Sequence, residues 1–144
     1  MSAEWEIGPA TAAAQLVATL ARADQGAGHA SVRLYATARP ASIAAPHSDT
    51  PQSTIALAKP CGAIADGVLT LHPQDAAGTL ILQAGIPRWA EWVAADGAVL
   101  ARGRVTDMDH DGAFRIEGAA TPEGEDSPLF FAGGLVQLGV TALV

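Results

Sequence analysis

Cysteine is almost absent from this chain of 144 residues, because Cys61 is its single cysteine. One thiol excludes an intrachain disulfide and gives no reason to expect a thiolate metal site. Long apolar runs are also absent, since none approaches the roughly 20 residues that a membrane-spanning helix needs. The opening sequence MSAEWEIGPA has two acids where a secretory signal has a basic region. We therefore expect a soluble, intracellular chain with no membrane partner.

Positive charge is scarce as well. Eight Lys and Arg residues stand against 15 Asp and Glu, for a formal charge of -7. A phosphate-binding surface needs clustered basic residues, so nucleic acid is excluded as an expected partner. Only 16% of the residues are charged at all. A surface this poor in charge favours a protein that is partly covered by copies of itself or by another protein.

One helix is predicted, over residues 11–23, with Thr11 as its N-cap. The alanine-rich sequence has high helix propensity, and its apolar residues recur every three or four positions. They form one face, made of Ala13, Leu16, Val17, Leu20 and Ala23. We assign residues 1–28 to an N-terminal arm with this helix and residues 29–144 to one β domain.

The β domain is predicted from short runs of β-forming residues, separated by Gly, Pro and Asp at intervals of about 8 to 12 residues. Such spacing is typical of an antiparallel sandwich or barrel. Strands are expected at 31–38, 53–59 and 67–73, the last after the turn signal Asp66-Gly67. Residues 40–53, rich in Pro and Ser, show no periodicity and are expected to form an exposed, mobile loop.

A hairpin is the clearest local signal. Two alternating runs flank Asp96-Gly97, a dipeptide suited to a tight two-residue turn. Near the end of the chain, GGLVQLGVTALV predicts a final strand that is buried on one face through to the last residue. That face consists of Val136, Leu138, Val140, Ala142 and Val144.

The stretch VTDMDHDGAFRIEG resembles the first half of an EF-hand loop, with Asp107, Asp109 and Asp111 at alternate positions before Gly112. An EF-hand also needs a flanking helix on each side and a Glu at its twelfth position, where this chain has Gly118. Phe114 and Ile116 then alternate inward, as in a strand. We predict a solvated hairpin loop; the alternative is a surface cation site formed by the three aspartates.

Residues able to catalyse a reaction are scattered. The histidines at positions 29, 47, 72 and 110 have no metal-binding spacing, and surface positions are expected for them. Cys61 has only Lys59 nearby and is predicted to be a structural, buried or half-buried residue. No phosphate-binding or nucleophile motif occurs. We expect no enzyme and no cofactor; the enzyme alternative would require a pocket that gathers Cys61, a histidine and an acid.

Aromatic residues are few, and three tryptophans raise the question of a sugar-binding surface. Trp89 and Trp92 fall on opposite faces of one strand, so at most one of them belongs to any exposed surface. A receptor-binding or glycan-binding module would place Tyr35, Trp92 and the acidic loop together at one exposed end. Tyr35 and Trp92 are therefore the candidate surface-binding residues.

The order of segments carries a family resemblance. GAGHASVRLYATARPAS, STIALAKPCGAIADGVLTL and AGTLILQAGIPRWAEWVAADGAVLARGRV follow the Ala-rich helix, and an acidic Gly-containing turn precedes the final strand. This order resembles small virion structural proteins of tailed phages and prophages with R-L/I-Y-x-G-T-R-P-A, G-G-V-L-T and W-x-R-V-x-D-x-D-G segments. The chain departs from that pattern at Ala36, where the family has Gly, at Glu91, where it has Arg, and in its closing GVTALV.

The resemblance covers most of residues 10–144 and implies a β-sandwich of the jelly-roll kind without catalytic residues. It implies a symmetric homo-oligomer, for which we favour a trimer, assembled in the host cytoplasm and built into the virion with other virion proteins. It favours the tail end or baseplate. The alternatives are a decoration protein on the head and a receptor-binding or glycan-binding module at the tail tip.

Overall fold

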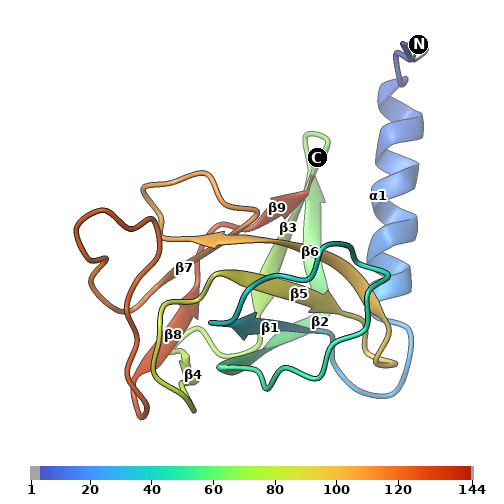
Figure 1. Cartoon of the computed structure of the whole chain (residues 1–144). Helices are drawn as coiled ribbons and strands as arrows, with labels where there is room; N and C mark the ends of the chain where they lie inside the picture. The colour runs from blue at the N-terminus through green and yellow to red at the C-terminus, as the bar shows by residue number, and fades with distance from the viewer. Residues whose placement is uncertain (1–3, 144) are drawn as a thin grey trace.

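The computed structural model describes residues 4–143. In this range one helix precedes nine strands, which curl into a half-barrel while the helix stands to one side (Figure 1). The elements are α1 (Pro9–Ala23), β1 (Ser31–Tyr35), β2 (Ser53–Ala65), β3 (Val68–Pro73), β4 (Thr79–Leu80), β5 (Trp89–Val93), β6 (Val99–Thr106), β7 (Phe114–Glu117), β8 (Leu135–Leu138) and β9 (Ala142–Leu143).

The strands form one sheet in the order β4-β8-β7-β6-β5-β1-β2-β3-β9. The prediction of a mainly β chain with one N-terminal helix is confirmed. The two packed layers of a sandwich or jelly roll are not confirmed, because the nine strands belong to a single curled sheet. Nor is the sheet purely antiparallel, since β6 and β7 run parallel.

Helix α1 begins two residues earlier than predicted. Pro9 lies in its first turn, where the missing N–H has no intrahelical partner to lose and the fixed φ suits a helix. Gly8 is therefore the N-cap, and the prediction of Thr11 at this position is wrong. The helix ends as expected at Ala23, where Asp24 forms the C-cap.

The predicted apolar face of α1 is only partly covered. Leu16 and Ala23 are buried, whereas Val17 is 57% exposed. Figure 1 shows that the helix leaves the domain at its C-terminal end, so that its first turns project away from the sheet. Trp5 and Ile7, which precede the helix, are also exposed.

Two glycine-containing turns fix the hairpins. The hairpin around Asp96 and Gly97 is confirmed and joins β5 to β6. Its loop has three residues, 95–97, because only Gly97 takes a positive φ, +94°. The two-residue turn with positive φ at both positions is Asp66-Gly67, which joins β2 to β3.

The acidic stretch is not the hairpin that the sequence predicts. Val105 pairs with Phe114, and Thr106 with Arg115, in parallel register. The Gly112 N–H donates a 2.9 Å hydrogen bond to Thr106 Oγ1 and so folds the loop back onto the end of β6. Strand β7 therefore runs in the same direction as β6. A Cβ at Gly112 would lie 2.8 Å from Thr106, so this close approach requires glycine.

The final strand is also not continuous. Val136 and Leu138 in β8 are buried as predicted, but Val140 and Ala142 are exposed, and Val144 lies outside the described residues. The alternation fails because the strand changes partners. β8 pairs with β4 and β7, whereas β9 pairs with β3 at one edge of the sheet.

Both faces of the central strands are buried. The inner face of β1 and β5 contributes Val32, Leu34, Ala90 and Trp92 to the core, so Trp92 is not the exposed residue that the sequence analysis suggests. Phe114 and Ile116 enter the same core from β7, also as predicted. The outer face of β1 and β5 carries Tyr35, Trp89 and Glu91, which are buried outside that core.

Candidate functional site

The outer face of β5 holds a buried carboxylate, Glu91, whose exposure is 1%. Tyr35 OH donates a 2.6 Å hydrogen bond to Oε1, and Arg102 Nε donates a 2.8 Å hydrogen bond to Oε2. His47 Nε2 lies 3.2 Å from Oε1. The strand register places Arg33 and Arg102 directly opposite Glu91 on the two neighbouring strands. The sheet itself thus brings this acid between two basic residues.

A loop closes over this cluster. Arg102 donates from Nη1 to the backbone oxygen of Ser42 at 2.9 Å and reaches that of Ala45 at 3.4 Å. Residues 36–52 have no regular secondary structure, so the loop predicted over 40–53 begins earlier, because the strand expected at 31–38 ends at Tyr35. Most of the side chains in 36–52 are exposed. His47, whose side chain is 15% exposed, and the buried Gln52 are among the exceptions. The loop is therefore anchored to the sheet rather than simply extended into solvent.

Aromatic stacking completes the cluster. The rings of Tyr35 and Trp89 are stacked with centroids 4.2 Å apart, and His47 meets both rings edge-on. The Arg102 guanidinium lies 5.5 Å from the centre of the Trp89 ring, within range of a cation–π interaction. These contacts bury Tyr35 from the outer side of the sheet.

The ionisation of the cluster follows from these contacts. Burial alone would raise the pKa of Glu91, but the hydrogen bonds from Tyr35, Arg102 and His47 outweigh it and hold that pKa below its ordinary value. Burial, together with the adjacent Glu91, raises the pKa of the Tyr35 phenol. At neutral pH a carboxylate therefore faces a protonated phenol. With its oxygens occupied by donors, Glu91 is suited to fixing the loop rather than to accepting a proton from a substrate.

An open depression lies beside this cluster. Its lining includes the charged residues Arg33, Asp49, Glu91 and Arg102, together with His47. The two arginines are balanced by the two acids, so the depression favours neither an anion nor a cation. The Glu91 cluster therefore anchors the 36–52 loop, and the depression beside it carries both positive and negative side chains.

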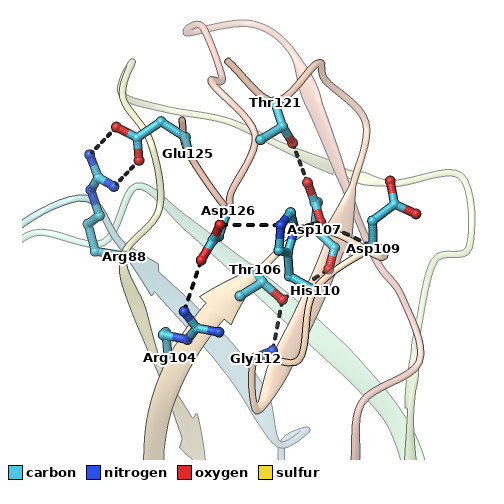
Figure 2. Close-up of polar contacts among 10 residues, drawn as sticks. All are labelled: Arg88, Arg104, Thr106, Asp107, Asp109, His110, Gly112, Thr121, Glu125 and Asp126. Atoms are coloured by element: carbon cyan, nitrogen blue, oxygen red, sulfur yellow. Dashed lines mark hydrogen bonds and ion pairs between the residues drawn. The ribbon is translucent and has the colours of Figure 1, made fainter. Parts of the chain in front are cut away.

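A second polar network surrounds the acidic loop (Figure 2). The imidazole of His110 lies between two carboxylates, with Nδ1 2.6 Å from Asp107 Oδ1 and Nε2 3.3 Å from Asp126 Oδ1. Thr121 Oγ1 donates a 2.6 Å hydrogen bond to Asp107 Oδ2. Arg104 Nη1 pairs with Asp126 Oδ2 at 3.1 Å. These contacts attach the segment between β7 and β8 to β6 and to the acidic loop.

The charges in this network shift two pKa values in opposite directions. The hydrogen bond to Asp107, aided by the charges of Asp107, Asp126 and Asp109, raises the pKa of His110. The hydrogen bonds from Thr121 and His110 lower the pKa of Asp107. His110 Nε2 faces a carboxylate and not a hydroxyl, so this pair has no nucleophile to activate. We call this arrangement, in which His110 pairs with Asp107 and Asp126, the His110 bridge.

Another ion pair lies beside the bridge. Arg88 Nη1 lies 2.6 Å from Glu125 Oε2 (Figure 2). Glu125 directly precedes Asp126 in the sequence. Through its hydrogen bond Arg88 lowers the pKa of Glu125, and Glu125 raises the pKa of Arg88. Both side chains are partly exposed, so this pair contributes little to stability on its own.

The candidate cation ligands are not gathered into a site. Asp107 uses both carboxylate oxygens in the contacts to His110, Thr121 and the Asp109 N–H. The Asp111 side chain is 97% exposed and lies 3.9 Å from Arg115. Between residues 4 and 143, no group of three or more His, Cys, Asp or Glu side chains is placed to hold a metal ion.

The candidate surface-binding residues, Tyr35 and Trp92, are both buried. They also lie on opposite faces of the sheet, because Tyr35 pairs with Trp89 and Val32 pairs with Trp92. An exposed aromatic platform beside the acidic loop is therefore not formed by these two side chains.

The remaining candidates are separated. Cys61 is buried as predicted, and burial together with Asp24 raises the pKa of its thiol to about 12, so it stays protonated at neutral pH. His29 and His72 are exposed as predicted. His47 is not, because the loop that carries it folds onto Glu91.

Sequence reasoning missed Glu91, although a signal was present. An acid between two tryptophans in WAEWV is unusual in a strand that is otherwise apolar. A hairpin turn centred on Asp96 and Gly97 also places residue 91 opposite residue 102, which is the register observed. The predicted hairpin therefore already implied that Glu91 lies opposite Arg102.

An exposed apolar surface was also missed. Leu80, Leu82, Phe131 and Leu135 are each more than half exposed. Leu80 and Leu135 are direct partners on β4 and β8, and backbone hydrogen bonds join Ile81 to Gly133 and Gly134 next to them. We call these four residues the edge patch, because β4 is one edge of the sheet.

Comparison with known proteins gives no relative. No protein-family model, curated protein or solved structure matches this chain. Among the described residues, α1 is neither long nor apolar enough to cross a membrane. Functional inference therefore depends on the surfaces and clusters described above.

Proposed function

We propose that this chain is a non-enzymatic structural protein of a tailed-phage virion, which assembles as a symmetric oligomer at the tail end or baseplate. The observation that carries the proposal is the edge patch, where four large apolar side chains are exposed on neighbouring segments. Contiguous exposed apolar side chains mark surfaces that other proteins cover. The projecting helix α1, with Val17 exposed, offers a second such surface.

The polar clusters support the same proposal. Glu91 and Asp107 are each occupied by several donors from the chain itself, and Cys61 is buried and protonated. These groups stabilise loops and leave no activated nucleophile in either network. The family resemblance of the strand and turn segments adds the virion location. From the same resemblance we also propose a trimer and a jelly-roll arrangement of the strands.

Oligomeric state tests the role of the edge patch. We expect the wild-type chain to form a discrete oligomer in light scattering after size exclusion. The double substitution L135S and F131S should shift it toward monomer without unfolding it. The matched control is I43S, which changes an exposed apolar residue on the 36–52 loop. A wild-type monomer at high concentration, or equal dissociation by the control, would contradict the proposed contact.

Virion location needs a separate test. Gold-labelled antibody against this chain, applied to particles released from the producing cell, should mark one end of the tail in negative stain. Label over the head would replace the tail assignment with a decoration protein. Particles without label, with the protein remaining soluble, would overturn the virion proposal.

A further inference from the structure

The depression beside the Glu91 cluster holds an arginine without a counter-ion. Arg33 lies on β1, lines the depression and is partly buried. Strand pairing places Glu91 directly opposite it on β5. Both oxygens of that carboxylate are already occupied, by Tyr35 and His47 at Oε1 and by Arg102 at Oε2. Among residues 4–143, no acid forms an ion pair with Arg33.

This guanidinium is available to a ligand. The neighbouring Tyr35 phenol is neutral and donates its proton to Glu91, so it does not serve as the counter-ion of Arg33. A guanidinium donates in a planar fork that matches the two oxygens of a carboxylate. Thr54 lies directly opposite Arg33 on β2, lines the same depression and is exposed, so it adds a hydroxyl donor. This part of the depression therefore fits a carboxylate that a ligand supplies.

The opposite charge comes from the 36–52 loop. Asp49 also lines the depression, and its side chain is 32% exposed. Its Oδ2 lies 3.6 Å from His47 Nδ1, and its backbone N–H donates a 3.3 Å hydrogen bond to the same nitrogen. In this arrangement Nδ1 is an acceptor, so the imidazole gives no proton to the Asp49 carboxylate. That carboxylate is therefore open to an ammonium group.

Apolar side chains form another part of the lining. Val99 on β6 is exposed, and Pro46 and Pro51 belong to the loop. The depression has a volume of about 580 Å³, which is in the usual range for pockets that bind small molecules. Like those pockets, it combines apolar walls with a few polar groups that can orient a ligand.

We propose that this depression binds a small zwitterion, an amino acid with an apolar side chain, whose carboxylate pairs with Arg33 and whose ammonium group pairs with Asp49. Its apolar side chain lies against Val99. A ligand with a single charge would be attracted by one of the two groups and repelled by the other. The inference does not depend on the virion assignment, because none of these residues belongs to the edge patch.

Nuclear magnetic resonance of the ¹⁵N-labelled full chain provides the test, with L-leucine as the probe. The reporters are the Arg33 side-chain Nε–H and the Asp49 backbone N–H, and we expect leucine to shift both in a saturable way. Two analogues each remove one charge: 4-methylpentanoate lacks the amino group, and 3-methylbutylamine lacks the carboxylate. Each should bind about tenfold more weakly, because it loses one charged hydrogen bond and meets one like charge.

Three substitutions assign the charges. R33Q should abolish the leucine-dependent shift at Asp49. R39Q is the matched control, because Arg39 is exposed and does not line the depression. D49N should bind leucine and 4-methylpentanoate equally, while 3-methylbutylamine remains the weaker ligand. Circular dichroism confirms that the variants fold. If R33Q unfolds, the changed ligand preference of D49N provides the test.

Three results would overturn the proposal. One is the absence of any saturable shift at the two reporters up to the solubility limit of leucine. Another is an unchanged response in a folded R33Q variant. The third is equal affinity of the wild-type chain for leucine and 4-methylpentanoate, which would leave Asp49 without a role.

Discussion

Glu91 and Arg102 face each other across the β5 and β6 strands, and the Arg102 Nε donates a 2.8 Å hydrogen bond to Glu91 Oε2. Arg102 also binds the carbonyls of Ser42 and Ala45 in the loop above. One arginine thus connects a buried acid on the sheet to a segment that has no secondary structure. The position of the 36–52 loop depends on this pair.

Removal of the Glu91 carboxylate should destabilise the domain strongly. E91A leaves the largely buried Arg102 guanidinium without its partner, and breaking such a pair costs about 3–5 kcal/mol. Urea denaturation monitored by circular dichroism measures the change in the free energy of unfolding. E117A is the matched control, because Glu117 is exposed on β7. Equal losses in the two variants would show that Glu91 has no special role.

Substitution of Arg102 by lysine should release the loop while keeping the charge. Lysine cannot reproduce the forked geometry that reaches Glu91 and two loop carbonyls together. We expect R102K to increase hydrogen exchange and protease cleavage within residues 42–47, with the far-ultraviolet spectrum unchanged. R88K, at an exposed ion pair, serves as the control. Full protection of residues 42–47 in R102K would contradict the anchoring role.

The His110 bridge should make the stability of the acidic loop depend on pH. The pKa of His110 is raised above its ordinary 6.5, so its contribution is complete below pH 6.5 and is lost as pH rises through the folded-state pKa. The pKa of Asp107 is lowered from 3.8, so its contribution is present above pH 3.8 and is lost as pH falls through the folded-state value.

We therefore expect the bridge to be strongest between about pH 4 and pH 6.5, where both partners are ionised. The difference in the free energy of unfolding between wild type and H110Q measures this contribution at each pH. It should shrink above pH 6.5 and again below pH 4. H72Q, at an exposed histidine, provides the control. A difference that does not vary with pH would exclude an ionised His110 bridge.

Gly62 should tolerate no side chain. A Cβ at this position would overlap the Thr70 backbone oxygen on the paired strand β3. G62A should therefore cost about 1–3 kcal/mol, the range for overpacking a buried site. G28A is the control, because the nearest atom to a Cβ at Gly28 is the Ala95 backbone oxygen at 3.6 Å, an ordinary contact. Thermal unfolding compares them, and a G62A variant as stable as G28A would refute the contact.

Local signals predicted the parts of the fold that local physics determines. Alternation placed Phe114 and Ile116 inward, where they belong to the core, and the Asp96-Gly97 dipeptide identified a hairpin. These features depend on side-chain period and on glycine backbone freedom, which are properties of neighbouring residues.

Long-range contacts determined the parts that could not be predicted. Tyr35 was a candidate surface-binding residue, but the 36–52 loop covers it through contacts to Glu91 and Arg102. The acidic stretch has the composition of a hairpin loop, yet the bond from Gly112 to Thr106 returns the chain in parallel. A pattern of charge and glycine cannot specify which strand a segment joins next.

The two edges of the sheet, β4 and β9, are each only two residues long. Long open edges recruit strands from other chains and allow sheets to extend into fibrils. Edges this short offer almost no backbone template, so growth by strand addition ends with the monomer. Contacts with other molecules are therefore expected through defined side-chain surfaces and not through strand addition.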